Sequence, residues 1–300
     1  MSNDITGHNE AVHLGACADA ADAMMGFNRI LEKRALTPDT REFQVLNAEI
    51  ASACAPGQFV IVRSDEKAER IPLTIADFDR KEGSITLVVQ IVGDATMRLD
   101  KLAAGDAIRD IVGPLGHSSE IGKFGTVVLV GGGLGIAPVY PIQRAMREAG
   151  NRVVSIIGAR SRNLVFWEDR MRATSDEFYL ATDDGTAGEK GFVTDILRRV
   201  IGAAPKPDRV IAIGPPVMMK AVAEVTRAPG IKTIVSLNPI MVDGTGMCGG
   251  CRVQVGNQTK FACVDGPEFD AHEVDFALLT SRLATYREVE KRAREQHGAA

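Results

Sequence analysis

The change of pattern at Thr126 constrains the fold more than any other feature of the sequence. Residues 126–130 (T-V-V-L-V) form a continuous apolar run, which is typical of a parallel strand buried on both faces. A glycine-rich turn at 131–138 and a helical pattern at 139–149 follow directly. Further strands are expected at 152–157, 177–181 and 209–213, with helices at 164–173 and 192–201. This alternation predicts a doubly wound, mostly parallel α/β sheet.

The preceding region, residues 27–122, has a different pattern. Short runs with strand-like alternation recur along it, at 42–47, 59–63 and 84–92. Turn signals separate them, notably at 56–57 and 113–116, and a short helix is expected at 97–102. Several short strands at regular spacing predict a small antiparallel β-barrel. The expected fold class is therefore a β-barrel joined to an α/β domain.

A third pattern lies near the C-terminus. Asp243, Cys248, Cys251 and Cys263 have the spacing D-x4-C-x2-C-x11-C. This matches the plant-type iron–sulfur pattern C-x4-C-x2-C…C, with aspartate in place of the first cysteine. Glycines let backbone N–H groups approach bridging sulfides where a Cβ would clash, and four stand in this loop, at 244, 246, 249 and 250. The spacing predicts a [2Fe–2S] cluster with these four side chains as ligands.

Spacing alone leaves other interpretations of this loop open. A C-x2-C pair is also half of a zinc site or a redox dithiol. Asp-Gly is a strong turn pair, so Asp243 could simply cap a turn. The sequence has no second C-x2-C or His pair to complete a typical zinc set, which favours the cluster. Because a carboxylate is a harder ligand than a thiolate, Asp243 is the ligand that most needs a test.

Composition excludes several classes of protein. At 300 residues, with 45% apolar and 25% charged residues, the chain is typical of a globular protein of two or three domains. A net charge of −4 gives no sign of the basic surface that binding nucleic acid requires. No apolar run approaches the roughly 18 residues that span a bilayer. No secretory signal is expected at the N-terminus, and five cysteines, three of them in one loop, argue against a disulfide framework, so we expect a cytoplasmic protein.

The turn at 131–138 (G-G-G-L-G-I-A-P) is a candidate nucleotide-binding loop. Glycines let the backbone approach a phosphate, and the following helix offers free N–H groups. The sequence is not a strict G-x-G-x-x-G, so a tight crossover without a ligand is the alternative. Turns that contain Asp183 and Gly214 follow later strands and are expected at the same sheet edge, although ordinary turn formation also explains them. The candidates in the glycine-rich turn are Gly131, Gly132, Gly133, Gly135, Ala137 and Pro138.

The barrel contributes a weaker signal. Residues 70–74 (R-I-P-L-T) follow a strand and a charged loop, and an arginine beside a hydroxyl can hold a phosphate or a flavin edge. Gly93 and Thr96 open a predicted helix and offer a second phosphate contact, although Thr96 as a plain helix cap is the alternative. The barrel candidates are Arg70, Pro72, Leu73, Thr74, Gly93 and Thr96.

Together these motifs resemble the ferredoxin–NADP reductase superfamily, through R-x-P-L-T at 70–74, G-P-L-G at 113–116, G-G-G-x-G-x-A-P at 131–138 and G-P-P-x-M-M at 214–219. The tail at 238–270 is similar to the small subunit of NADH-dependent ferredoxin:NADP oxidoreductase, of the sulfide dehydrogenase type. It is also similar to the electron-transfer subunit of dihydroorotate dehydrogenase, which has cysteine at the first ligand position. Asp243 therefore favours the former.

The resemblance implies three cofactors. FAD would bind the barrel through Arg70, Pro72, Leu73 and Thr74, with Gly93 and Thr96 near its phosphates. NAD(H) would bind along 131–138, beside Asp183 and Gly214, and the [2Fe–2S] cluster would bind Asp243, Cys248, Cys251 and Cys263. The sequence departs from many relatives at two positions. Leu73 replaces an aromatic residue that stacks on the flavin, and Ile213 replaces a cysteine.

The implied activity is that of a flavin and iron–sulfur oxidoreductase subunit linked to NAD(P). NADH would give a hydride to FAD and the cluster would relay single electrons, so no side chain is expected to be catalytic. A larger subunit with its own FAD and iron–sulfur clusters, related to the glutamate synthase small subunit, would complete a heterodimer that links NADH, NADPH and ferredoxin by electron bifurcation. The alternatives are the electron-transfer subunit of dihydroorotate dehydrogenase and a non-catalytic, zinc-bearing scaffold.

The patterns divide the chain into an N-terminal extension at 1–26, an FAD-binding barrel at 27–122, an NAD-binding domain at 123–235, a cluster module at 236–275 and a C-terminal helical segment at 276–300. A short helix is expected at 19–25, and an amphipathic helix is expected from 276 to about 295. Arg160 and Arg162, after the second α/β strand, could meet a 2′-phosphate. The residues therefore do not decide between NAD and NADP.

Overall fold

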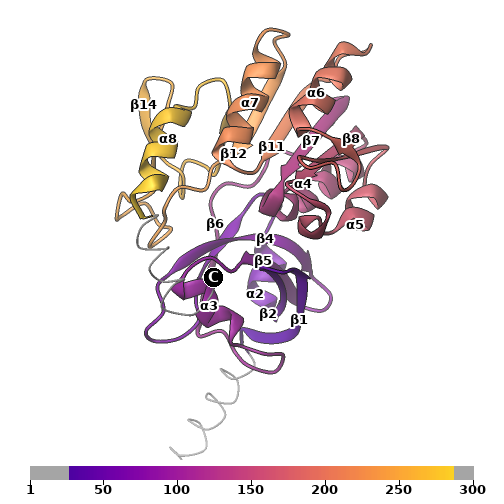
Figure 1. The fold of residues 1–300 in the computed structure, drawn as a ribbon. Helices are drawn as coiled ribbons and strands as arrows, with labels where there is room; N and C mark the ends of the chain where they lie inside the picture. Colours follow the sequence, from indigo (N-terminus) through magenta and orange to yellow (C-terminus); the bar gives the residue numbers. More distant parts are fainter. Residues whose placement is uncertain (1–26, 287–300) are drawn as a thin grey trace, which may run out of the picture.

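The structure, a computed structural model, describes residues 27–286. Its chain forms a barrel-like sheet, an α/β layer and a C-terminal part that lies beside helix α7 (Figure 1). This arrangement confirms the predicted fold class. The predicted extension and its helix at 19–25 lie outside the described residues.

Six antiparallel strands form the barrel-like sheet in the order β1-β2-β5-β4-β3-β6. Their alternating inward side chains, including Phe43, Val45, Ile85 and Leu87, make one apolar core. Helix α2 (Ala48–Ala53) is capped by the Asn47 side chain, which accepts a hydrogen bond from the Ile50 N–H. A second helix, α3, spans Asp94–Asp100. The strands are β1 (Arg29–Thr37), β2 (Thr40–Leu46), β3 (Phe59–Arg63), β4 (Ile71–Asp79), β5 (Ser84–Gln90) and β6 (Asp110–Leu115).

A seven-stranded sheet forms the α/β layer, in the order β10-β9-β8-β7-β11-β12-β15, and only β15 is antiparallel to its neighbour. Alternate residues of β7 face opposite sides: Val127 and Leu129 pack with helices α4 and α5, whereas Val128 and Val130 pack with α6 and α7. Helices therefore cover both faces, as predicted. The strands are β7 (Thr126–Gly132), β8 (Arg152–Ala159), β9 (Glu177–Thr182), β10 (Glu189–Lys190), β11 (Arg209–Ile213), β12 (Lys232–Ser236) and β15 (Glu268–Asp270). The helices are α4 (Ile136–Glu148), α5 (Glu168–Ala173), α6 (Val193–Gly202) and α7 (Pro216–Arg227).

The C-terminal part is a loop that carries Cys248 and Cys251, a hairpin that Cys263 follows, and a helix. Strands β13 (Arg252–Val255) and β14 (Gln258–Phe261) pair in antiparallel register, and β15 returns the chain to the main sheet beside β12. Helix α8 (Phe276–Leu283) packs against α7. A 3-10 turn, η3 (Ala284–Tyr286), follows it, so the α-helix expected to reach residue 295 ends at Leu283, and residues beyond 286 lie outside the described part.

Several local predictions were wrong. Residues 113–115 belong to β6 rather than to a turn, and residues 71–74, for which no element was predicted, begin β4. Helix α4 begins at Ile136 rather than at 139, because Pro138 stands in the first turn, where a missing N–H breaks no helical hydrogen bond. The helix expected at 164–173 is divided into a 3-10 turn, η2 (Arg162–Leu164), and α5, with Trp167 in the left-handed region between them.

Candidate cofactor sites

A cavity of about 760 Å³ lies between the barrel and the α/β layer, within the size range of small-molecule sites. Both layers line it: β4 contributes one wall and the turn after β7 contributes the other. Most of the predicted FAD and NAD(H) residues meet here, namely Pro72, Leu73, Thr74, Gly132, Gly133, Gly135, Ala137, Pro138, Asp183 and Gly214. Four predicted residues do not line it: Arg70, Gly93, Thr96 and Gly131.

The turn after β7 is close-packed in a way that requires glycine. A 3-10 turn, η1 (Gly133–Gly135), leads into α4 across the end of β11. A Cβ on Gly135 would lie 2.1 Å from the Ile213 carbonyl oxygen, and one on Gly132 would lie 2.2 Å from the Met218 sulfur. Both the crossover and the ligand interpretations need these glycines. The cavity beside them adds the space that a dinucleotide requires.

The remaining barrel candidates have other surroundings. Thr96 Oγ1 accepts hydrogen bonds from the N–H groups of Val92 and Gly93, each at 3.0 Å, and donates to the Gly93 carbonyl at 2.9 Å. Its hydroxyl therefore closes the first turn of α3, as the helix-cap alternative supposed. Arg70 is exposed just before β4, and its side chain has no partner among residues 27–286.

The cysteine loop brings two of its four predicted ligands into contact. Cys251 and Cys263 are 1% and 2% exposed, and their Sγ atoms lie 3.1 Å apart. Cys248 is exposed, and its Sγ accepts a hydrogen bond from the Gly250 N–H at 3.4 Å. Among the described residues, no three His, Cys, Asp or Glu side chains converge closely enough to hold a metal ion.

Asp243 organises the same loop. Its Oδ1 accepts from the Thr245 N–H and its Oδ2 from the Cys248 N–H, both at 2.9 Å. These two bonds, the first above all, lower the pKa of Asp243, so the side chain is a carboxylate at neutral pH. Asp243 therefore caps the turn, as one alternative supposed. Each carboxylate oxygen keeps a second lone pair, so a metal contact is compatible with this cap.

The donor set of the loop fits an iron–sulfur cluster. Burial and the adjacent Cys251 raise the pKa of the Cys263 thiol to about 12, while a hydrogen bond from the Gly246 backbone opposes them. Buried sulfurs become thiolates when a cation compensates their charge, which is the role of iron. Gly244, Gly246 and Gly249 all have positive φ, which turns the loop tightly around the sulfurs.

Sequence reasoning missed several residues that line the cavity. Asp39, in the β1–β2 turn, is partly desolvated, but hydrogen bonds from Gln90, Thr37 and Thr40 outweigh that effect and lower its pKa. No local motif marks this turn. In contrast, the lining residues 236–238 lie at the carboxyl end of β12, so the rule that ligands bind beyond strand carboxyl ends could have found them.

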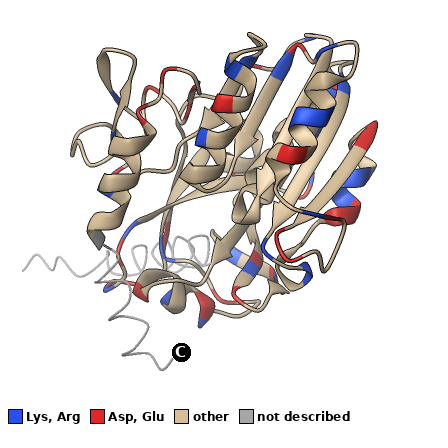
Figure 2. Cartoon of the chain, turned by 45° about the horizontal axis from the view of Figure 1, so that its top comes forward, with Lys and Arg blue, Asp and Glu red and all other residues tan. Residues whose placement is uncertain are grey.

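The two arginines considered for a 2′-phosphate have different surroundings. Arg160 lines the cavity, and its side chain has no partner within the described part of the chain. Arg162 is paired with Glu168, with 2.5 Å between Nη1 and Oε2. Acidic and basic side chains are otherwise mixed over the helices and strand ends (Figure 2). None of the helices within residues 27–286 is long and apolar enough to cross a membrane.

Comparison with known proteins assigns both halves of the site. A model described as "Oxidoreductase NAD-binding domain" matches residues 129–224, and "Iron-sulfur cluster binding domain of dihydroorotate dehydrogenase B" matches residues 238–275. A Thermotoga maritima protein, "Dihydroorotate dehydrogenase B (NAD(+)), electron transfer subunit homolog", is 49% identical over 88% of this chain and 93% of its own length. The electron transfer subunit of dihydroorotate dehydrogenase B from Geobacillus thermodenitrificans is 34% identical over 84% of this chain and 99% of its own length.

Among solved structures, a chain of the NADH-dependent reduced ferredoxin–NADP oxidoreductase is 46% identical, with a TM-score of 0.86, over 90% of this chain and 98% of that chain. Fold, cavity and cysteine loop thus define an electron-transfer subunit of an NAD-linked oxidoreductase, with FAD, NAD(H) and a [2Fe–2S] cluster as cofactors. The chain belongs to the family of dihydroorotate dehydrogenase B electron transfer subunits and their homologues, within the ferredoxin–NADP reductase superfamily. This confirms the resemblance and sets the zinc and dithiol interpretations aside.

Proposed function

We propose that this chain is the NAD(H) module of an electron-bifurcating, NADH-dependent reduced ferredoxin:NADP⁺ oxidoreductase. One observation carries the proposal: residues 236–238 and Met241 line the cavity, and the same segment continues into Asp243 and the cysteine loop. In this proposal, a few residues of one chain therefore join the flavin site to the cluster site. When bound, FAD exchanges a hydride with NAD(H) as two electrons, and the cluster carries them singly.

The side chains of the cavity bind and orient the cofactors in this proposal. Pro72, Leu73 and Thr74 on β4 face the flavin. Arg70, Gly93 and Thr96, which do not line the cavity, are proposed to lie towards its phosphates. Residues 132–138, with Asp183 and Gly214, hold the dinucleotide. Apolar lining from Leu73, Ile213 and Met218 excludes water from the space between them. Asp243, Cys248, Cys251 and Cys263 hold the cluster.

The exposed surface of the cysteine loop is evidence for binding of a partner subunit. Met247 and Val242 are 89% and 48% exposed in the loop that carries the exposed Cys248, and Val264, 39% exposed, follows β14 and lies beside Gly246 of that loop. Exposed apolar residues gathered at one site mark an interaction surface. The partner proposed for it is the larger FAD and iron–sulfur subunit related to the glutamate synthase small subunit, through which ferredoxin is reached.

Co-purification from the native host tests this function. The proposal expects a heterodimer whose larger subunit carries FAD and iron–sulfur clusters, and which reduces NADP⁺ with NADH and reduced ferredoxin together. A second candidate, the electron-transfer subunit of dihydroorotate dehydrogenase, is favoured by the names of the relatives at 49% and 34% identity. A partner that oxidises dihydroorotate would establish that candidate instead.

A further inference from the structure

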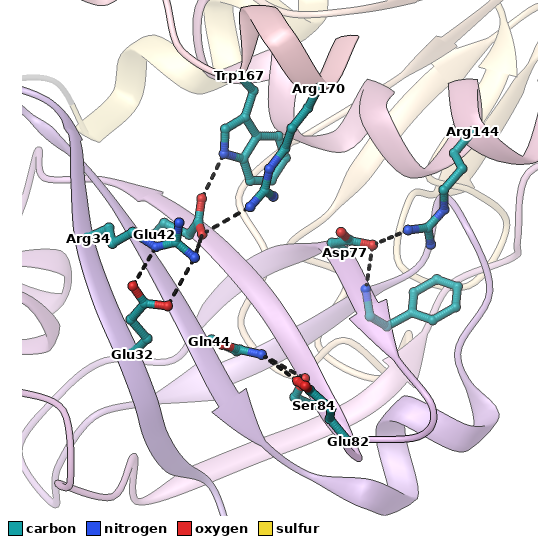
Figure 3. A network of polar contacts seen from close by, with 11 residues as sticks. Glu32, Arg34, Glu42, Gln44, Asp77, Glu82, Ser84, Arg144, Trp167 and Arg170 are labelled. Carbon is teal, nitrogen blue, oxygen red and sulfur yellow. Dashed lines mark hydrogen bonds and ion pairs between the residues drawn. The ribbon is translucent and has the colours of Figure 1, made fainter. Parts of the chain in front are cut away.

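The barrel and the α/β layer meet through the carboxylate of Glu42 (Figure 3). Glu42 stands on β2 and is only 3% exposed. Its Oε2 accepts a hydrogen bond from the Trp167 indole N–H at 2.7 Å. Its Oε1 lies 3.6 Å from Arg170 Nη2 of α5 and 3.3 Å from Arg34 Nη2 of β1. One buried carboxylate thus has donors from both layers.

The partner of this carboxylate, Trp167, is fixed in an unusual conformation. It has φ 55° and ψ 22° at the N-terminus of α5, in the left-handed region that a residue with a side chain adopts only where its surroundings hold it. Its ring lies edge-on to Tyr140 and Phe166, with centroids 5.4 Å and 5.8 Å away. The Arg170 guanidinium lies 4.5 Å from the same ring. The indole is therefore held by several contacts, and the hydrogen bond to Glu42 comes from the barrel.

Both ends of this contact continue into the walls of the cavity. Phe166, the residue before Trp167, lines the cavity, and so does Thr40, two residues before Glu42 on β2. A second contact joins the layers elsewhere, because Arg144 Nη1 of α4 donates to Asp77 Oδ1 of β4 at 2.7 Å. With the Glu42 contact removed, the layers keep that second contact and the packing of α4 on β4, but they lose the hydrogen bond to Trp167, the residue that follows Phe166.

We propose that Glu42 is a positioning residue for the nicotinamide dinucleotide. By accepting from the Trp167 indole, it holds the Phe166 wall against the barrel at the separation that the dinucleotide requires. This role rests on the proposed function, in which the cavity takes NAD(H). Losing the contact lowers the fraction of molecules in the binding arrangement and weakens the apparent affinity in proportion.

The first test detects the contact itself. Trp167 is the single tryptophan of the chain, so the holoprotein labelled with ¹⁵N-tryptophan gives one indole N–H resonance. Glu42→Ala should speed its exchange with solvent about tenfold, since a hydrogen bond to a charged group is lost. Glu42→Gln keeps an acceptor oxygen and should keep most of the protection. The matched control is Glu82→Ala, because Glu82 accepts from Gln44 within the barrel. Unchanged exchange in Glu42→Ala would overturn the proposal.

The second test detects the effect on the dinucleotide. Glu42→Ala should raise the Kd for NADH about tenfold without change in FAD content, and Trp167→Phe, which keeps an aromatic ring, should do the same. The double variant should be no weaker than either single variant, because both remove one interaction. Equal NADH affinity in wild type and Glu42→Ala would overturn the positioning role of Glu42 but not the proposed function. Additive losses of NADH affinity in the double variant would do the same. A wild-type protein that does not bind NADH would overturn the proposed function as well.

Discussion

Asp243 illustrates how one residue can serve both fold and chemistry. Its two oxygens already accept from the Thr245 and Cys248 N–H groups, which fixes the turn before the cysteines. The same bonds lower its pKa and keep it in the anionic form that the proposed role as an iron ligand requires. A cysteine at this position could replace the ligand but not the pair of turn-forming hydrogen bonds.

A variant at this position tests the ligand. Asp243→Cys should retain a cluster, but with a shifted reduction potential and an altered EPR spectrum, since ligand type tunes both. Redox titration followed by EPR measures the change. An unchanged potential and spectrum would mean that Asp243 only caps the turn.

Cys251 supplies a second prediction for a single residue. Cys251→Ala should abolish the cluster and leave FAD bound, because Cys251 lies in the C-terminal loop, whereas the predicted flavin residues lie on the barrel. Cys54→Ala is the matched control: Cys54 is equally buried, and burial raises the pKa of its thiol to about 11, so it should behave as a small apolar residue. Iron, sulfide and flavin assays measure both variants. Simultaneous loss of iron and flavin in Cys251→Ala would contradict this separation.

At the scale of elements, the turn between β7 and α4 depends on two glycines for different reasons. Gly135→Ala forces a Cβ against the backbone of Ile213 and should lower the free energy of unfolding by about 3 kcal/mol. The same substitution should weaken dinucleotide binding. Gly133 has φ 55° but open space around it, so Gly133→Ala should cost only about 1–2 kcal/mol. Urea denaturation compares the two variants. Equal losses would show that backbone conformation, rather than close packing, explains the need for glycine.

The sequence predicted the elements wherever local pattern decided the structure. The apolar runs of β7 and β3 can be recognised in the local sequence, and both strands were found. The break before α5 was missed because Trp167 takes its conformation beside Glu42, a residue 125 positions away in the chain. The cavity residues recovered from the sequence carry motifs, as in the glycine-rich turn. Asp39 and Phe166 carry none, because they line the cavity only when two layers meet.

At the scale of the whole molecule, Glu268 lies where the barrel, the sheet and the C-terminal part come together. It stands on β15 and binds the Ser119 hydroxyl, with Arg209 and Glu120 nearby. Burial raises its pKa above the ordinary value of 4.5, although Ser119 and Arg209 oppose this effect. Between 4.5 and the raised value, the folded protein holds a proton that the unfolded chain has lost.

The free energy of unfolding should therefore decrease as pH rises from 4.5 to the raised pKa of Glu268. The Glu268→Gln variant should lack the part of this decrease that Glu268 causes. Urea denaturation of the two proteins from pH 4.5 upward measures the difference. A wild-type stability that rises relative to Glu268→Gln over this range would contradict the sign of the shift.

Anaerobic titration of the purified chain with NADH, followed by optical and EPR spectroscopy, tests the central claim most directly. Protein with about two irons and two acid-labile sulfides per chain should show bleaching of the flavin and then the EPR signal of a reduced [2Fe–2S] cluster. Protein without iron and sulfide, or a cluster that stays oxidised beside a fully reduced flavin, would contradict the claim that one polypeptide conducts electrons from NADH to its cysteine loop.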